Sequence, residues 1–393
     1  MQNKKNLNNQ PNQNEMAELE SLFKSNELDK LETKITEFIS TYPNVPVLYN
    51  ILGIVCQKKN DINRAILNFK KAIDLRPNFD QALNNLGNVL QHKGQFEEAI
   101  SNYHKVIKIN SNYPEAYSNL GNALAKLGKF EEATINYKKA IKLNSNQPEF
   151  YTNLGSSLVE LGKIEEAISN HQQAIKLNSN YAEAYSNLGN AQAELGKFEE
   201  AIANYQLAVK LNPKYKEAIK NESMLRLTMG DFKIGWEKYD ARLEENIDIP
   251  VVYENEKKWN GEYLDGTLLV WGEQGIGDHI IFSSMLFDLK NQAKNILLQI
   301  DKRLENLLNR YFKKVNFLNI KIISSEKKFT GKFDKHIAIG SLGQYFRKSR
   351  DSFKTTPKKY LVTSIEKENE YKKKFLNNNK FKIGISWKTL NKI

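Results

Sequence analysis

Apolar positions between residues 45 and 213 recur at a constant interval of 34 residues. A Leu-Gly pair marks each copy: Leu52-Gly53, Leu86-Gly87, Leu120-Gly121, Leu154-Gly155 and Leu188-Gly189. Within one copy, a first helical face is followed by Gly128 and then by a second face: Tyr117, Leu120, Gly121 and Leu124, then Phe130, Ala133, Tyr137 and Ala140. This period predicts repeated pairs of helices joined by a tight turn.

The pattern resembles the tetratricopeptide repeat (TPR). The family's small residue in the second helix and its aromatic residue four positions later both recur here: Ala65, Ala99, Ala133, Ala167 and Ala201, then Phe69, Tyr103, Tyr137, His171 and Tyr205. The resemblance covers about Asn14 to Leu243 and implies a right-handed superhelix whose first helices line a concave face. We expect a disordered segment at 1–14 and a TPR superhelix at 15–243. Five regular repeats fall within 45–213, with a degenerate repeat at each end.

The last copy departs from the pattern. Glu222-Ser223 stands where Leu-Gly would recur, and Trp236 has no counterpart in earlier copies. We expect Trp236 to pack against whatever follows the repeats.

A row of asparagines follows the same interval on the predicted first helices. Asn85, Asn119, Asn153, Asn187 and Asn221 each precede Leu or its equivalent, and Asn88, Asn122 and Asn190 follow three residues later, with Ser156 in the remaining place. Amides carry donors and an acceptor, so a stacked row is able to hold an extended peptide backbone. The row resembles the asparagine ladder of the eukaryotic O-linked N-acetylglucosamine transferase, which implies protein or peptide binding on the concave face. The alternative is that these amides bind water or one another between helices.

After Leu243 the 34-residue period ends, and 244–266 is predicted to be a linker. Short apolar runs then alternate with amphipathic segments: strands at Thr267–Trp271, Asn295–Ile300, Asn319–Ser324, Lys335–Ile339 and Phe381–Trp387, and helices at Asp278–Leu289, Asp301–Phe312 and Ser364–Leu376. This alternation indicates a parallel sheet. The predicted fold class is therefore an α-solenoid followed by an α/β Rossmann-like parallel-sheet half-domain at 267–380. Residues 381–393 would be the first strand of a missing second half.

The loop after the first predicted strand is the stretch that could carry chemistry. Gly275 and Gly277 let a ligand approach the main chain at the carboxyl end of a strand. The loop matches neither the G-x-G-x-x-G pattern nor a Walker A motif. The wider context resembles a bacterial family in which TPR repeats precede a glycosyltransferase-like domain, through motifs such as Trp259 to Glu262, Glu273 to Asp278, Phe333 to His336 and Ile383 to Trp387. The Gly277-Asp278 turn also resembles the heptosyltransferases, which have two Rossmann-like halves facing across a cleft, the GT-B arrangement.

This resemblance implies that Asp278 is the catalytic base that takes the acceptor hydroxyl proton. It implies acceptor or loop contacts from Glu273, Gln274, Gly275, Gly277 and His279. The alternative is that Asp278 only caps a helix. Completed by a second half, the domain would transfer a sugar from a nucleotide-sugar donor. Without that half, the alternative is a non-enzymatic TPR scaffold that binds extended peptides or proteins.

Composition narrows the partners further. The net charge is +12, and from Asp301 onward 24 Lys and Arg stand against 8 Asp and Glu. These lysines lack interleaved aromatic residues, so nucleic acid is not an expected partner. Five His and one Cys show no metal-ligand spacing, and neither a metal nor a covalently bound cofactor is expected. The absence of a long apolar run or a signal-like N-terminus, together with the single Cys56, predicts a cytoplasmic protein without a membrane span.

Overall fold

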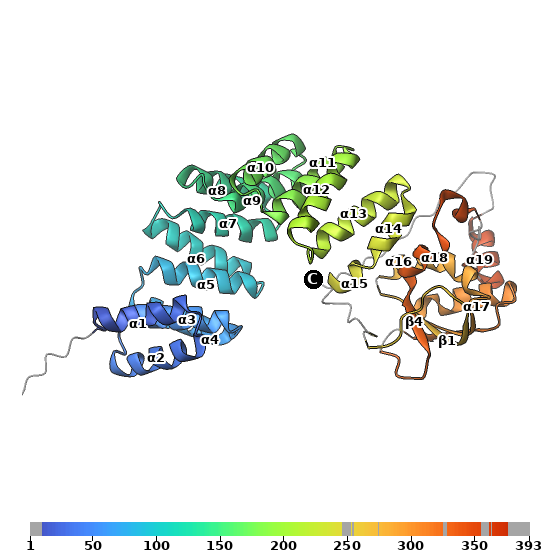
Figure 1. The fold of residues 1–393 in the computed structure, drawn as a ribbon, viewed down its shortest axis with the longest axis horizontal. Coiled ribbons are helices and arrows are strands. Elements are labelled where there is room, and N and C mark those ends of the chain that lie inside the picture. The colour runs from blue at the N-terminus through green and yellow to red at the C-terminus, as the bar shows by residue number, and fades with distance from the viewer. Residues whose placement is uncertain are drawn as a thin grey trace, which may run out of the picture. The chain divides into compact units, whose positions relative to one another are not determined.

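A computed structural model of the protein describes residues 10–245, 253, 255–273, 275–324, 328–354, 361–362 and 364–375. The chain divides into two compact units, Met1–Tyr215 and Lys216–Ile393. The described part of the first unit is helical, whereas the second combines helices with a parallel sheet (Figure 1).

Helix pairs follow one another through the first unit, coloured blue to green in Figure 1. The helices are α1 (Gln13–Lys24), α2 (Leu28–Thr41), α3 (Pro46–Lys58), α4 (Ile62–Leu75), α5 (Asp80–His92), α6 (Phe96–Ile109), α7 (Pro114–Lys126), α8 (Phe130–Leu143), α9 (Pro148–Glu160), α10 (Ile164–Leu177), α11 (Ala182–Glu194) and α12 (Phe198–Leu211). The predicted helical repeats are confirmed. Odd-numbered helices from α3 to α11 are the first helices of the repeats, and even-numbered helices from α4 to α12 are the second helices.

The Leu-Gly pairs lie where the two helices of a repeat cross. A Cβ atom on Gly121 would stand 2.6 Å from the ring of Tyr137, so only glycine allows this approach. Leu120 and Ala133 are buried beside it. The turn between the helices contains Gly128, whose φ of 74° is in the left-handed region that favours glycine.

The predicted disordered segment 1–14 overlaps the start of the first helix. Asn12 caps α1: its side chain accepts a hydrogen bond from the Glu15 amide at 3.0 Å, and the Glu15 carboxylate accepts one from the Asn12 amide at 2.7 Å. This reciprocal capping box satisfies two amides that a helix start otherwise leaves unpaired, so ordered structure begins before residue 14.

The second unit begins with α13 (Lys216–Met229), α14 (Phe232–Tyr239) and α15 (Arg242–Glu245). Glu222 is fully buried and accepts hydrogen bonds from Arg226 Nε at 2.8 Å and Lys238 Nζ at 2.5 Å. Ser223 Oγ donates to the Gly235 carbonyl at 2.8 Å. Polar bonds thus replace the Leu-Gly contact that joins the helices of the regular repeats.

Four parallel strands form the sheet of the second unit, in the order β3-β2-β1-β4. The strands are β1 (Leu264–Trp271), β2 (Ala293–Ile300), β3 (Ile320–Ser324) and β4 (Lys335–Ala338). In the centre, Leu269 pairs with Leu297 on one side and with His336 on the other. The predicted α/β part is confirmed as a small parallel sheet, while the strand predicted at 381–387 lies outside the described residues.

Helical segments connect the strands and follow β4. They are α16 (Ile276–Phe282), η1 (Ser283–Leu289), η2 (Lys302–Leu304), α17 (Glu305–Lys314), η3 (Ile339–Leu342), α18 (Gly343–Phe346), η4 (Arg350–Phe353) and α19 (Ile365–Phe375). The predicted helix at 278–289 is therefore a short α-helix that continues as a 3₁₀ helix. Trp236 of α14 packs on Gly343, and its Nε1 donates to the Arg347 carbonyl at 2.8 Å. The prediction that Trp236 packs against the following element is confirmed.

The segment before β1 covers the outer edge of β4. Lys258 forms a parallel bridge with His336. The Trp259 amide donates to the His336 carbonyl at 2.8 Å, and the His336 amide donates to the Lys257 carbonyl at 3.0 Å. This part of the predicted linker 244–266 is thus an edge partner of the sheet.

Candidate functional site

The predicted asparagine row lies on successive first helices, and its members are half-buried. Asn85 Nδ2 donates to Asn50 Oδ1 at 3.1 Å, and Asn119 Nδ2 donates to Asn84 Oδ1 at 3.2 Å. In the early repeats, each row amide is therefore fastened to the preceding first helix.

In the later repeats of the first unit, the amides of the row make fewer and longer hydrogen bonds to the neighbouring helices. Asn187 Nδ2 reaches only Ser156 Oγ, at 3.5 Å, and the Asn153 side chain has no hydrogen-bond partner among the described residues. Asn221 lies on α13, in the second unit. Asn153 and Asn187 are thus the members whose amides are least engaged by the repeats themselves.

The companion asparagines bind inside their own repeats. Tyrosine hydroxyls of the second helices donate to their amide oxygens at 2.7 to 2.8 Å: Tyr103 to Asn88, Tyr137 to Asn122 and Tyr205 to Asn190. These three oxygens join the first helix to the second helix through tyrosine, a pairing that neither reading of the row predicted.

The α9–α10 repeat lacks this asparagine–tyrosine pair. Ser156 and His171 occupy the two positions, and the fully buried His171 ring has no hydrogen-bond partner at either nitrogen. Burial lowers the pKa of His171 to about 4, which keeps the ring neutral at pH 7. The buried hydroxyls of Thr152 on α9 and Ser186 on α11 also make no hydrogen bond.

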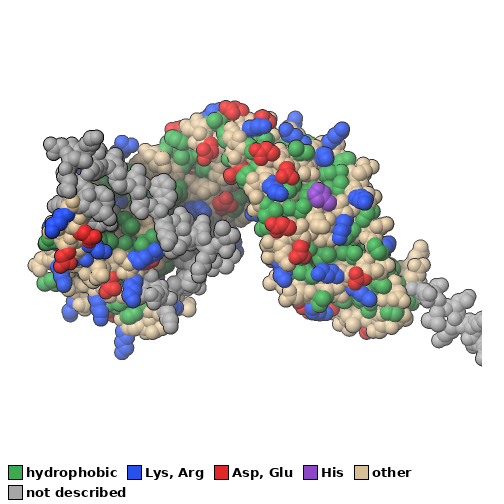
Figure 2. Space-filling model, turned by 180° about the vertical axis from the view of Figure 1, so that it is seen from behind, with side chains coloured by type: hydrophobic (Ala, Val, Ile, Leu, Met, Phe, Trp, Pro, Cys, Tyr) green, Lys and Arg blue, Asp and Glu red, His purple; other side chains and the backbone are tan. Residues whose placement is uncertain are grey.

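Charge is distributed unevenly over the first helices. α9 and α11 carry four exposed glutamates and no Lys or Arg: Glu149, Glu160, Glu183 and Glu194. By contrast, α7 ends in Lys126, and the second helices α8, α10 and α12 carry lysines in their last turns. On the molecular face in Figure 2, acidic and basic side chains are interspersed over the repeats. Among the first helices α3 to α11, Lys and Arg are absent from α5, α9 and α11, and α9 and α11 carry two exposed glutamates each.

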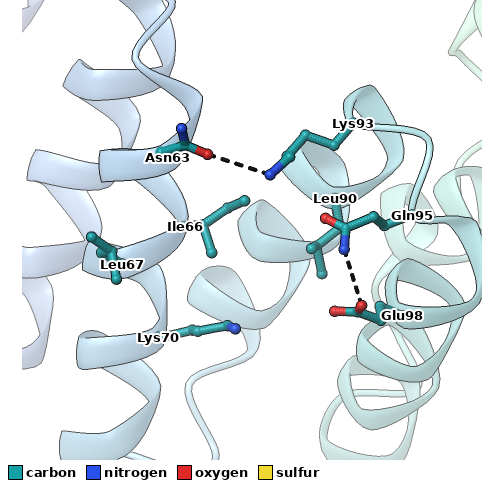
Figure 3. A pocket seen from close by; sticks show the side chains of 8 residues that line it. All are labelled: Asn63, Ile66, Leu67, Lys70, Leu90, Lys93, Gln95 and Glu98. Atoms are coloured by element: carbon teal, nitrogen blue, oxygen red, sulfur yellow. Dashed lines mark hydrogen bonds between the residues drawn. The ribbon is translucent and has the colours of Figure 1, made fainter.

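A pocket of about 320 Å³ lies between the second helices α4 and α6 (Figure 3). Ile66, Leu67 and Leu90 supply its apolar wall. At its rim, Lys93 Nζ donates to Asn63 Oδ1 at 3.3 Å and Gln95 Nε2 donates to Glu98 Oε1 at 3.1 Å. None of the predicted site residues lines this pocket.

At the carboxyl end of β1, Glu273 is locked into a buried cluster. Its Oε1 accepts from Arg242 Nη2 at 2.5 Å, from Arg242 Nε at 3.2 Å and from the Gly340 amide at 3.2 Å. Arg242 Nη2 also donates to Ser341 Oγ at 3.2 Å. Burial raises the pKa of Glu273, which Arg242 opposes. Of its two predicted roles, shaping the loop fits this buried position.

Asp278 and His279 differ in exposure. Asp278 is half-buried, and Gly275 is the N-cap of α16, so the reading of Asp278 as the N-cap is wrong. His279 is buried against Gly272, and its Nδ1 accepts from the Asp301 amide at 3.3 Å. Burial lowers the pKa of His279.

Gly275 and Gly277 are exposed beside Asp278, whereas Gln274 lies outside the described residues. Glu273 and His279 are buried, whereas Asp278 is half-exposed. Among the described residues of this loop, Asp278 is therefore the acidic side chain that solvent reaches.

Within the described ranges, no group of three or more His, Cys, Asp and Glu side chains is arranged to hold a metal ion. None of the helices described there has the length and apolar character needed to cross a membrane.

Three features escaped the sequence reasoning. Arg242 and Ser341 complete the Glu273 cluster from 31 and 68 positions away, and no local pattern points to them. A second row at the same period consists of Asn50, Asn84, Ser118, Thr152 and Ser186, of which the last four directly precede asparagines of the predicted row. A further row, Asn102, Asn136, Asn170 and Asn204, lies on second helices and donates to carbonyls four residues earlier.

Two family models match the repeats. The model described as TPR repeat matches residues 53–94, 92–128, 121–159 and 155–196, and the model described as tetratricopeptide repeat matches residues 182–220. Residues 53–220 therefore consist of TPR repeats. The matches end before the sheet, so they lend no support to a glycosyltransferase-like domain.

Individual relatives agree on the helical part. Protein FlbA of Caulobacter vibrioides is 29% identical over 133 residues, which are 30% of this chain and only 22% of that protein. A chain of the APC/C hetero-tetramer Cut9–Hcn1 superposes with a TM-score of 0.52 at 21% identity, over 58% of this chain and 46% of that chain. YrrB, described as a TPR protein with an unusual peptide-binding site, gives 0.40 at 23% identity, over 48% and 97% of the two chains. The Cut9–Hcn1 similarity shows the fold.

Proposed function

We propose that the protein is an interaction scaffold whose first helices bind an extended peptide or protein segment. The observation that carries this proposal is the row Asn85, Asn119, Asn153 and Asn187, which places a half-buried amide at one position of four successive first helices. Packed helices lie roughly 10 Å apart, a distance that about three residues of extended peptide span. One amide per helix therefore suits a backbone that crosses the helices in turn.

Helix packing supports the choice of face. Among the described helices, successive first helices contact one another, from α3–α5 to α9–α11, more closely than successive second helices do. A stack of repeats whose first helices lie closer together than its second helices bends so that the first helices are on the inner side of the curve. The amides would then line the inner side of the curve, where an elongated ligand meets several repeats at once.

The test compares two triple variants. Peptides are selected with the full chain from a display library, and their Kd is measured by fluorescence anisotropy. Replacing Asn119, Asn153 and Asn187 with Ala removes three amides of about 1 kcal/mol each, so Kd should rise about a hundredfold. The matched control replaces Asn102, Asn136 and Asn170 with Ala on the second helices and should leave Kd unchanged. Equal Kd values for the two variants would contradict the proposal, once circular dichroism shows that both are folded.

A second candidate function is nucleotide-sugar binding at the sheet, with sugar transfer dependent on Asp278 as base. Strand order supports it, because β3-β2-β1-β4 matches the first four strands of a doubly wound nucleotide-binding sheet. In such sheets ligands bind where the strand order reverses, which is here between β1 and β4. The half-buried Asp278 follows β1 at that place.

Calorimetry tests this second candidate. The full chain is titrated with a uridine diphosphate sugar and with an adenosine diphosphate sugar, and heat of binding is expected from one of them. A Cβ atom on Gly277 would meet no other atom within 4 Å, so Gly277→Leu should fold normally and obstruct only the ligand. No heat with either sugar, or heat that Gly277→Leu leaves unchanged, would remove this candidate.

A further inference from the structure

Unsatisfied polar groups of the first unit are concentrated in one place. Within its described residues, the buried side-chain atoms without a hydrogen-bond partner belong to Thr152, His171 and Ser186, on α9, α10 and α11. Several equivalent positions in earlier repeats are satisfied: Asn50 and Asn84 accept from the next repeat, and Tyr103 and Tyr137 donate to asparagines. Position 118, by contrast, also holds a buried serine.

Such groups carry a stability cost. A buried polar group without a partner costs about 1–3 kcal/mol, and the neighbouring repeats show that the same backbone accommodates satisfied side chains. Natural proteins leave buried polar groups without hydrogen-bond partners mainly at functional sites. The α9–α11 stretch is therefore the part of the first unit where hydrogen bonds from a bound partner would add the most stability.

The unsatisfied hydroxyls lie along the asparagine row. Thr152 directly precedes Asn153, and Ser186 directly precedes Asn187. Asn84, at the same position of its repeat, accepts from the row amide of the next first helix, so this position points into the seam beneath the row. By the same geometry, Thr152 of α9 faces Asn187, the row amide of α11.

Charge in the same stretch is of one sign. Tyr181, the N-cap of α11, donates from its hydroxyl to Glu183 Oε2 at 3.1 Å. Burial raises the pKa of Tyr181, and the carboxylates of Glu183 and Glu149 raise it further, whereas the neighbouring Thr152 hydroxyl lowers it. Charges from two successive first helices therefore act on one hydroxyl that also lies beside Thr152. No Lys or Arg on α9 or α11 offsets them.

We propose that α9 and α11 form the binding segment for an extended basic peptide, with Asn153 and Asn187 holding its backbone and Glu149 and Glu183 pairing with its Lys or Arg side chains. This inference rests on the proposed function and adds the location and the chemistry of the partner. Alternate side chains of an extended peptide point the same way, so every second residue reaches the glutamates. An acidic peptide or a nucleic acid would meet repulsion at Glu149 and Glu183.

The probe is a fluorescent, end-blocked peptide of about nine residues that alternates lysine and serine, long enough to cross three helices. Two matched peptides carry glutamine or glutamate in place of lysine. Anisotropy with the full chain should show the lysine peptide binding at least tenfold more tightly than the glutamine peptide, and the glutamate peptide not binding. Tighter or equal binding of either matched peptide would overturn the inference.

Variants locate the site. The pair Glu149→Gln and Glu183→Gln should raise Kd of the lysine peptide about fivefold at low salt, because each exposed ion pair contributes modestly. The control pair Glu131→Gln and Glu165→Gln changes exposed glutamates on the second helices α8 and α10 and should leave Kd unchanged. If the two pairs of substitutions changed Kd equally, the basic side chains would not be bound at α9 and α11, and the proposed location would be wrong.

A last comparison separates this inference from the proposed function. Asn153→Ala with Asn187→Ala should weaken the lysine peptide more than Asn85→Ala with Asn119→Ala. If the glutamine peptide binds as tightly as the lysine peptide and both depend on Asn153 and Asn187, the basic preference is wrong and the peptide-binding function stands. If neither pair of asparagine substitutions changes the Kd of any of the three peptides, both this inference and the proposed peptide-binding function are wrong.

Discussion

The two units satisfy their buried polar groups in opposite ways. In the first unit the partners are close in sequence, 15 positions apart for Tyr137 and Asn122 and 35 for Asn119 and Asn84. In the second unit, Ser341 donates to Asp240 across 101 positions, and Trp236 reaches Arg347 across 111. The first unit repeats one local solution, whereas the second depends on single contacts between distant segments.

This difference determines how each unit responds to damage. A repeat that loses its polar pair, as the α9–α10 repeat has, still keeps its neighbours and its Leu-Gly contact. In the second unit, Arg242 of α15 is hydrogen-bonded both to Glu273 after β1 and to Ser341 after β4, and this arrangement is not repeated along the chain as the asparagine–tyrosine pairs are. Three experiments probe this contrast, beginning with the largest expected effect.

Removal of Arg242 should destabilise the second unit alone. Arg242→Met leaves the buried Glu273 without its charge partner, which should lower the free energy of unfolding by about 3–5 kcal/mol. All four tryptophans belong to residues 216–393, so tryptophan fluorescence during urea unfolding reports the second unit, while circular dichroism follows mainly the helical first unit. Arg303→Met, which removes an exposed arginine, is the control. A fluorescence transition shifted no more than in that control would contradict the role of Arg242.

Acid should weaken the first unit through His171. Its pKa of about 4 lies below the ordinary value of 6.5, so between these pH values the unfolded chain binds a proton that the folded chain does not. Stability should therefore fall as pH drops from 6.5 to 4, by roughly 3 kcal/mol. His171→Phe, which copies Phe69, should remove most of this slope, whereas His104→Phe at an exposed position should not. Identical slopes in the two variants would show that His171 does not carry the effect.

Rebuilding the missing pair should stabilise the first unit by about 1–2 kcal/mol. Ser156→Asn with His171→Tyr recreates the bond that joins Asn122 and Tyr137 one repeat earlier. The reverse exchange, Asn122→Ser with Tyr137→His, should destabilise by a similar amount. The helical transition in urea, followed by circular dichroism, measures both. A rebuilt repeat no more stable than the native one would mean that its neighbours already compensate for the defect.

The repeats were readable from the sequence because their interactions are local. Leu120, Gly121 and Ala133 lie within one helix pair, so their spacing alone predicts how the helices pack. The same spacing placed Asn85 and Asn119 on one row. Their hydrogen bonds to Asn50 and Asn84 could not be predicted, because these bonds depend on how each helix is rotated about its axis relative to its neighbour.

The second unit was only partly readable. The strands were predicted from short apolar runs, yet their order depends on pairings between distant segments. Glu273 and Asp278 are acidic residues five positions apart on one loop, and their different exposure could not be predicted from the sequence. Glu273 is buried because Arg242 arrives from another helix, and no spacing rule contains that information.

The pairing of Lys257 to Trp259 with β4 has a consequence for how the protein is made. During synthesis this segment leaves the ribosome before β1, β2 and β3, but its hydrogen-bonding partner is the last of the four described strands. Until residue 338 has been translated, the segment's backbone has only water to bind. We therefore expect the second unit to mature late and in one step, whereas each repeat gains its native contacts as soon as its second helix emerges.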